Sequence, residues 1–177
     1  ELSIVSEEME MNQAKAVMAY KVSSDDRDAC MLAAKMFGGT PFSKLFSNVR
    51  EKMSLCYYCS ARAVRIKGYL TVQSGIEKEN AEKAQTAILN ELKKLQSGKV
   101  SDGEFNASVL GLSDSLNAYY DSSEALETWY SVKIADKKIL SPEEFAEKIK
   151  LVTKEDVISV AKSIRLHTVF KLLPKEM

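Results

Sequence analysis

Arg50 and Tyr57 are the residues of this chain whose types and spacing best suit chemistry. They lie in the run GGTPFSKLFSNVREKMSLCYYCSARA, residues 38–63, which reads as a turn, a helix and the start of a strand. A helix that ends beside a strand can direct a guanidinium and a phenol to one point. There both groups can donate hydrogen bonds to a substrate carbonyl and stabilise a developing oxyanion. A purely structural interpretation stays open, in which Arg50 complements the helix dipole and Tyr57 packs on the sheet.

Metal and nucleophile chemistry have little support in the sequence. The single histidine, His167, falls in a predicted strand with no carboxylate or cysteine at ligand spacing, whereas a catalytic zinc needs three clustered protein ligands. The motifs HEXXH, HXXEH and G-x-S-x-G are absent, and the Gly-Gly-Thr turn at 38–40 matches no phosphate-binding loop. We therefore expect no metal ligand and no cofactor-binding residue in this chain.

The three cysteines are Cys30, Cys56 and Cys59. The C-x-x-C spacing of the last two invites a redox or zinc interpretation. If both lay in a strand, however, their side chains would point to opposite faces and their Cα atoms would be roughly 10 Å apart, too far for a disulfide. Only a tight turn at 56–59 would bring them together, and we do not expect one. Free thiols in odd number suit a reducing compartment, which favours the cytoplasm.

Composition and charge exclude some classes of partner. Lys plus Arg and Asp plus Glu are 25 each, so the net charge of zero argues against a nucleic-acid binder. No apolar run approaches the roughly 20 residues that span a bilayer, so we expect no membrane partner. The N-terminus does not resemble a signal peptide. It also lacks an initiator Met, which favours a piece of a longer polypeptide.

The elements around Arg50 and Tyr57 are predicted from capping residues and periodicity. Residues 1–12 are acidic and aperiodic and are expected to be a connector, followed by a single domain at 13–177. A strand at 13–22 leads to a helix that ends at Gly38 and Gly39. We expect Thr40 to cap the next helix, with Pro41 at its first position. Its buried stripe would comprise Phe42, Leu45, Phe46, Val49 and Met53.

The remainder alternates between strand and helix signals. Two strands, at 57–65 and 69–76, are joined at Lys67 and Gly68, and an amphipathic helix follows at 78–96. Further helices begin at the capping residues Ser101, Ser141 and Thr153, and a final strand includes HTVFKLL. This order predicts an α+β fold of two layers, a mostly antiparallel sheet packed by helices on one face.

The run FGGTPFSKLFSNVREKMSLCYYCSA resembles the non-catalytic half of the pitrilysin/insulinase family of zinc metallopeptidases, which includes mitochondrial processing peptidase. The shared pattern is a Gly pair, a helix ending in Arg-Glu-Lys, and a tyrosine seven residues after the arginine. The strand at 66–76, the helix pair at 77–120 and the helix LVTKEDVISVAKSI extend the resemblance over about residues 13–173. Ser54 departs from the pattern, which has a glycine there.

The resemblance implies a role for this chain. Family members consist of two homologous α/β halves around a chamber; one half carries zinc on HXXEH and the other supplies an arginine and a tyrosine. By position these are Arg50 and Tyr57, with Tyr58 on the opposite face. Zinc is then expected in the partner half, in the same polypeptide or a paired subunit. The implied substrate is a peptide, and this chain alone would bind no zinc and cut nothing.

Two other functions remain open at this stage. Some whole chains of the family have lost zinc binding and act as partner or assembly subunits; an HXXEH motif upstream would argue against that. An unrelated redox or metal domain using Cys56 and Cys59 is the second, and zinc bound at these two residues would support it.

Overall fold

The computed structural model describes residues 2–64, 68–134 and 138–175, and within them a five-stranded sheet has the order β1-β5-β2-β4-β3. Neighbouring strands are antiparallel except that β1 runs parallel to β5. This confirms the predicted α+β fold with a mostly antiparallel sheet. The strands are β1 (Ser3–Met9), β2 (Ala14–Val22), β3 (Tyr58–Val64), β4 (Tyr69–Ile76) and β5 (Ile164–Pro174).

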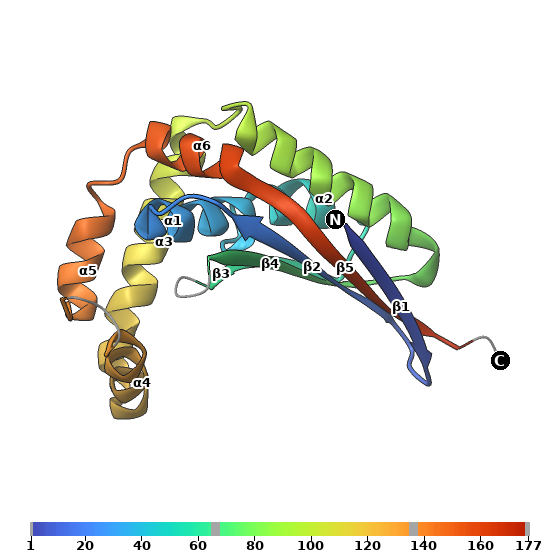
Figure 1. Cartoon of the computed structure of the whole chain (residues 1–177), viewed down its shortest axis with the longest axis horizontal. Coiled ribbons are helices and arrows are strands. Elements are labelled where there is room, and N and C mark those ends of the chain that lie inside the picture. The colour runs from blue at the N-terminus through green and yellow to red at the C-terminus, as the bar shows by residue number, and fades with distance from the viewer. Residues whose placement is uncertain (1, 65–67, 135–137, 176–177) are drawn as a thin grey trace.

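The helices form a layer on one face of the sheet. Figure 1 shows α1, α2 and α6 above the strands, while α3, α4 and α5 stand at one end and α4 reaches below the level of the sheet. The helical segments are α1 (Arg27–Gly38), η1 (Leu45–Lys52), η3 (Lys78–Asn80), α2 (Ala81–Gln96), α3 (Asp102–Asn117), η4 (Ala118–Asp121), α4 (Ser123–Lys133), α5 (Pro142–Ile149) and α6 (Lys154–Ser163).

The core lies between the sheet and this helix layer. Alternate residues of β2 are buried, because successive side chains of a strand point to opposite faces. Met18 and Tyr20 of β2 pack with Leu32 and Phe37 of α1, and all four are almost completely buried. The residues of β2 that alternate with the buried ones are exposed or half-buried. Their side chains point to the other face of the sheet, which is therefore open in this chain.

Residues 3–9, which we expected to belong to a connector, form the edge strand β1. Every residue of β1 is exposed, so its sequence carries no alternation of buried and exposed positions. Its pairing partner, β5, is at the other end of the chain, from Ser3 opposite Thr168 to Met9 opposite Pro174. A strand that is defined only by such a distant partner leaves no local signal.

The helix that carries Arg50 also differs from the prediction. η1 is a π-helix that begins at Leu45, and the Thr40 hydroxyl, expected as its cap, has no hydrogen-bond partner among the described residues. Leu45 and Val49 are buried as predicted, but Phe42 is 67% and Met53 48% exposed. η1 extends only over Leu45–Lys52, so Phe42 lies before it and Met53 just after it, and neither is on the helical face that Leu45 and Val49 share.

Most other boundaries are confirmed. Ser101 with Glu104, Ser141 with Glu144 and Thr153 with Asp156 form capping boxes at the starts of α3, α5 and α6. In the β3–β4 connection, Gly68 has a φ of +63°. Lys67, the other residue of that predicted joint, lies outside the described residues.

Candidate functional site

Arg50 and Tyr57 line the same surface pocket, which has a volume of about 410 Å³. Arg50 comes from the last turn of η1, and Tyr57 from the segment that leads into β3. The other walls belong to that segment and to the start of the α2 region, and include Ser54, Leu55, Cys56, Glu77 and Asn80. The structure therefore brings together the two residues that the sequence singled out.

The guanidinium of Arg50 lies over an aromatic ring. Its Cζ is 4.6 Å from the ring centroid of Phe46, one turn earlier in η1, and its Nε is 3.7 Å from Oε1 of Glu51. The side chain of Arg50 is 39% exposed and that of Glu51 57%. An ion pair this exposed contributes at most about 1 kcal/mol, so Glu51 does not hold the guanidinium against an incoming ligand.

Tyr57 and Tyr58 have different surroundings although they are adjacent. The amide of Tyr57 donates a 2.8 Å hydrogen bond to the Gly75 carbonyl, and its side chain is 48% exposed in the pocket wall. The ring of Tyr58 covers Gly75, where an added Cβ would lie 2.5 Å from its Cε1 atom. The phenol that shares the pocket with Arg50 is therefore that of Tyr57.

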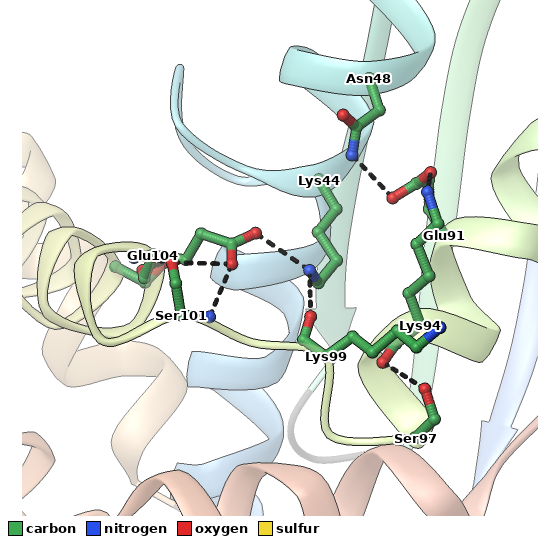
Figure 2. Close-up of polar contacts among 9 residues, drawn as sticks. Lys44, Asn48, Glu91, Lys94, Ser97, Lys99, Ser101 and Glu104 are labelled. Atoms are coloured by element: carbon green, nitrogen blue, oxygen red, sulfur yellow. Dashed lines mark hydrogen bonds and ion pairs between the residues drawn. The ribbon is translucent and has the colours of Figure 1, made fainter.

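Partly buried polar contacts fix the helix that carries Arg50 (Figure 2). The Asn48 amide donates a 2.8 Å hydrogen bond to Glu91 of α2, whose carboxylate also accepts from Lys94 at 2.6 Å. Just before η1, Lys44 donates to the Lys99 carbonyl at 2.6 Å and to Glu104 at 2.9 Å.

Sequence reasoning missed Glu91, which is completely buried. A signal was nevertheless present. Glu91 falls at helical spacing among Ile88, Leu92 and Leu95, on the apolar face of α2, and a carboxylate at such a position needs a hydrogen-bonding partner.

Ser54 has a φ of +51° and is the only non-glycine residue with positive φ among the described residues. This left-handed conformation is the one that glycine adopts without steric cost. It explains physically why the family pattern has glycine at this place, and the turn forms here with serine instead. Tyr57 consequently reaches the pocket despite the departure from the pattern.

The strand geometry on which we expected Cys56 and Cys59 to point to opposite faces does not apply to this pair. Cys56 precedes β3 and Tyr57 lies in a bend, so the strand geometry that separates residues three apart does not extend to Cys56. The hydrogen bond from Cys59, and then the charge of Arg50, lower the pKa of Cys56 against the opposing effect of burial. The same hydrogen bond and burial raise the pKa of Cys59.

No group of three or more His, Cys, Asp or Glu side chains that could hold a metal occurs among the described residues. His167 lies in β5, and its Nδ1 is 2.8 Å from the Thr168 hydroxyl. Within the residues that the structure describes, no helix is both long enough and apolar enough to cross a bilayer.

The family model of the "peptidase M16 inactive domain" matches residues 1–112 of this chain. A curated relative, the probable inactive metalloprotease YmfF of Bacillus subtilis, is 32% identical over 172 residues, which cover 95% of this chain and 40% of that protein. The beta subunit of the mitochondrial-processing peptidase of Saccharomyces cerevisiae is 39% identical over 72 residues, 40% of this chain and 16% of that subunit. The chain thus spans less than half the length of these curated relatives.

Solved structures show the same fold. A conserved protein from Enterococcus faecalis superposes with a TM-score of 0.88 and 30% identity, over 99% of this chain and 42% of that one. A protease from Helicobacter pylori superposes with a TM-score of 0.81 and 15% identity, over 98% of this chain and 44% of that one. These findings confirm the resemblance that the Arg50–Tyr57 run predicted.

Proposed function

The chain belongs to the family of peptidase M16 inactive domains, and we propose that it is the substrate-binding, zinc-free half of a two-half zinc metallopeptidase that cleaves peptides in an enclosed chamber. The observation that carries this proposal is the convergence of Arg50 and Tyr57 on one solvent-open pocket. The partner is a catalytic half, in the same polypeptide or in a paired subunit.

Zinc is expected from that catalytic half, where it would activate a water, because the described residues of this chain offer no metal-binding cluster. This chain contributes hydrogen-bond donors. The Arg50 guanidinium and the Tyr57 hydroxyl can both donate to a peptide carbonyl oxygen that enters the pocket. Donors that are already oriented stabilise the negative charge that develops on this oxygen during attack.

The test uses the complete enzyme that contains this domain. Arg50→Ala and Tyr57→Phe should each lower peptide turnover by roughly ten- to a thousandfold, as loss of an oxyanion donor does. The zinc content should be unchanged, because neither residue is a ligand. Turnover at the wild-type rate in both variants would contradict the proposal.

Two control variants separate loss of these donors from general damage. Lys52→Ala removes an exposed cation of the same helix that does not line the pocket, and Tyr130→Phe removes the hydroxyl of an exposed tyrosine in α4. Both should retain turnover close to that of the wild type.

A second function has support of its own. The Bacillus subtilis relative is described as a probable inactive metalloprotease, so this chain could belong to a family member that acts as a non-catalytic partner subunit. An HXXEH motif in the polypeptide that contains this domain, together with bound zinc, would favour the peptidase. Absence of both from that polypeptide and from its paired subunit would favour the partner subunit.

We further propose a cytoplasmic location, because Cys30, Cys56 and Cys59 are all free. Fractionation of the native host cells would test it, with recovery outside the cytoplasm as the opposing result.

A further inference from the structure

A second surface pocket, with a volume of about 570 Å³, lies where the C-terminal ends of α2 and α6 meet the start of β5. Figure 1 shows the C-terminal part of α2 beside α6, which continues directly into β5. The apolar lining is formed by Leu89, Leu92, Ile164 and Leu166. Leu92 and Ile164 are buried, whereas Leu89 and Leu166 are half-buried and present aliphatic surface to a ligand. The volume is in the range of small-molecule sites, roughly 300–1,000 Å³.

The charged lining of this pocket is entirely cationic. It consists of Lys93, Lys162 and Arg165, and the remaining lining residue is Gln96. None of the three cations forms an ion pair with any residue that the structure describes. The chain as a whole carries 25 residues of each sign. Three cations without a carboxylate are therefore a local excess of positive charge, which attracts anions.

A role at the helix ends does not occupy the ammonium groups of Lys93 and Lys162. Both residues lie in the last turns of their helices, where the helix dipole favours a positive charge. The carbonyls at these ends have other donors, however. In α2 the Lys93 carbonyl accepts a backbone amide at 3.0 Å, and in α6 the Ala161 carbonyl accepts the Gln96 side-chain amide at 3.2 Å. Neither ammonium group has a hydrogen bond within the described ranges, so both are available to a ligand.

Arg165 is held in place by backbone carbonyls on one side of its guanidinium. Its Nη1 donates to the Lys162 carbonyl at 2.5 Å and to the Ile164 carbonyl at 3.0 Å. Its Nε and Nη2 have no hydrogen-bond partner in the described parts of the chain. A guanidinium that is already oriented loses less side-chain freedom when it binds an anion, and its free nitrogen atoms match the two oxygens of a carboxylate.

We propose that this pocket binds an aliphatic carboxylate, the chemical class of a free fatty acid. Nε and Nη2 of Arg165 bind the carboxylate, and the ammonium groups of Lys93 and Lys162 add to the attraction. The hydrocarbon chain covers Leu89 and Leu166. The lining has no aromatic ring, hydroxyl or carboxylate, so it suits a plain alkyl chain better than a sugar or a nucleotide.

The proposal does not depend on the peptidase function. Asn80 of the Arg50–Tyr57 pocket directly precedes α2, whereas Lys93 and Gln96 lie at the other end of that helix. The 16 residues of α2 span about 24 Å, so the two pockets are separate.

The test is a calorimetric titration of the complete polypeptide that contains this domain with decanoate. We expect one molecule of decanoate to bind per domain. Hexanoate, which has a shorter chain, and decanol, which lacks the carboxylate, should each bind at least about tenfold more weakly. A photoreactive diazirine analogue of decanoate should label peptides of α2 and of the start of β5, as mapped by mass spectrometry.

Charge variants test the contacts of the head group. Arg165→Gln should weaken decanoate binding at least about tenfold. Lys93→Gln combined with Lys162→Gln leaves the side chain of Arg165 intact and should weaken binding about three- to thirtyfold. Lys83→Gln, at an exposed position of α2 that does not line the pocket, is the matched control. This control and Arg50→Ala should both bind decanoate as the wild type does.

Several results would overturn the proposal. These are no detectable binding of decanoate, decanol bound as tightly as decanoate, an affinity unchanged by the charge variants, or photolabelling outside α2 and β5. An acidic peptide that binds this pocket while decanoate does not would also overturn it, since the surface would then belong to a protein partner.

Discussion

Asn48 of η1 donates a 2.8 Å hydrogen bond to Glu91 of α2, and this contact links the helix of Arg50 to a completely buried carboxylate. Asn48 lies two residues before Arg50 on the same π-helix. Such helices have less regular hydrogen bonding than α-helices and frequently occur at functional sites. The Asn48–Glu91 hydrogen bond therefore positions Arg50 by fixing its helix, and the bond itself lies outside the pocket.

Asn48→Ala should lower the free energy of unfolding by about 1–3 kcal/mol, because it leaves the buried Glu91 carboxylate without one of its donors. The backbone amides of η1 should also exchange faster with solvent deuterium under native conditions. Urea unfolding and hydrogen exchange measure the two effects. Lys52→Ala, at an exposed position of the same helix, is the control and should change neither; equal exchange rates in both variants would argue against the positioning role.

Ser54→Gly should raise the free energy of unfolding by roughly 1 kcal/mol, since glycine relieves the cost of a left-handed residue and loses part of that gain in chain entropy. Denaturant unfolding measures it. The matched control is Ser47→Gly inside η1, where glycine should instead destabilise by about 0.5–1 kcal/mol. A loss of stability in Ser54→Gly would mean that the serine side chain makes a compensating contact.

The parts of the fold that the sequence predicts correctly are those with local signals. A capping box such as Ser101 with Glu104 satisfies the first amides of its own helix, so four residues suffice to mark the start of α3. The pairing of Arg50 with Tyr57 is also local, because η1 and β3 are consecutive and their connection directs both side chains to one place.

The features that sequence reasoning missed depend on distant partners or on backbone geometry. β1 exists through its register with β5, and Glu91 is placed by Asn48, which lies on another helix. Cys56 lies outside β3 because Tyr57 is in a bend, and the adjacent residues Tyr57 and Tyr58 do not signal a turn. In each case the decisive interaction is outside the window over which periodicity is read.

Acid should destabilise this protein partly through Glu104. Burial acts to raise the pKa of Glu104, but the hydrogen bonds from the Ser101 amide and the Lys44 ammonium outweigh burial and place the pKa below its ordinary value of 4.5. A lowered pKa in the folded state contributes stability that is complete above about 4.5 and is lost as the pH falls through the folded value.

The Glu104→Gln variant isolates that contribution. The difference in unfolding free energy between wild type and variant should be largest near neutral pH and should shrink as the pH falls below about 4.5, as measured by urea unfolding. Lys44→Met, which removes the ammonium, should likewise make the free energy of unfolding less dependent on pH. A difference that stays constant with pH would show that the folded pKa of Glu104 is not lowered.

Gly75→Ala should destabilise the edge of the sheet next to Tyr57 by about 1–3 kcal/mol, because the new methyl would lie 2.5 Å from the Cε1 atom of Tyr58 and must displace that ring. The displaced ring adjoins the backbone of Tyr57, whose amide donates a hydrogen bond to the Gly75 carbonyl.

In a Tyr58→Ala background the same change has no ring to displace, so Gly75→Ala should cost little or even stabilise the strand. A double-mutant cycle by urea unfolding should give a coupling energy of about 0.5–3 kcal/mol. Gly103→Ala, where the nearest atom is 3.9 Å from the added methyl, is the control and should be neutral or stabilising. A coupling energy near zero would mean that Tyr58 moves aside without cost and that glycine is not required beneath it.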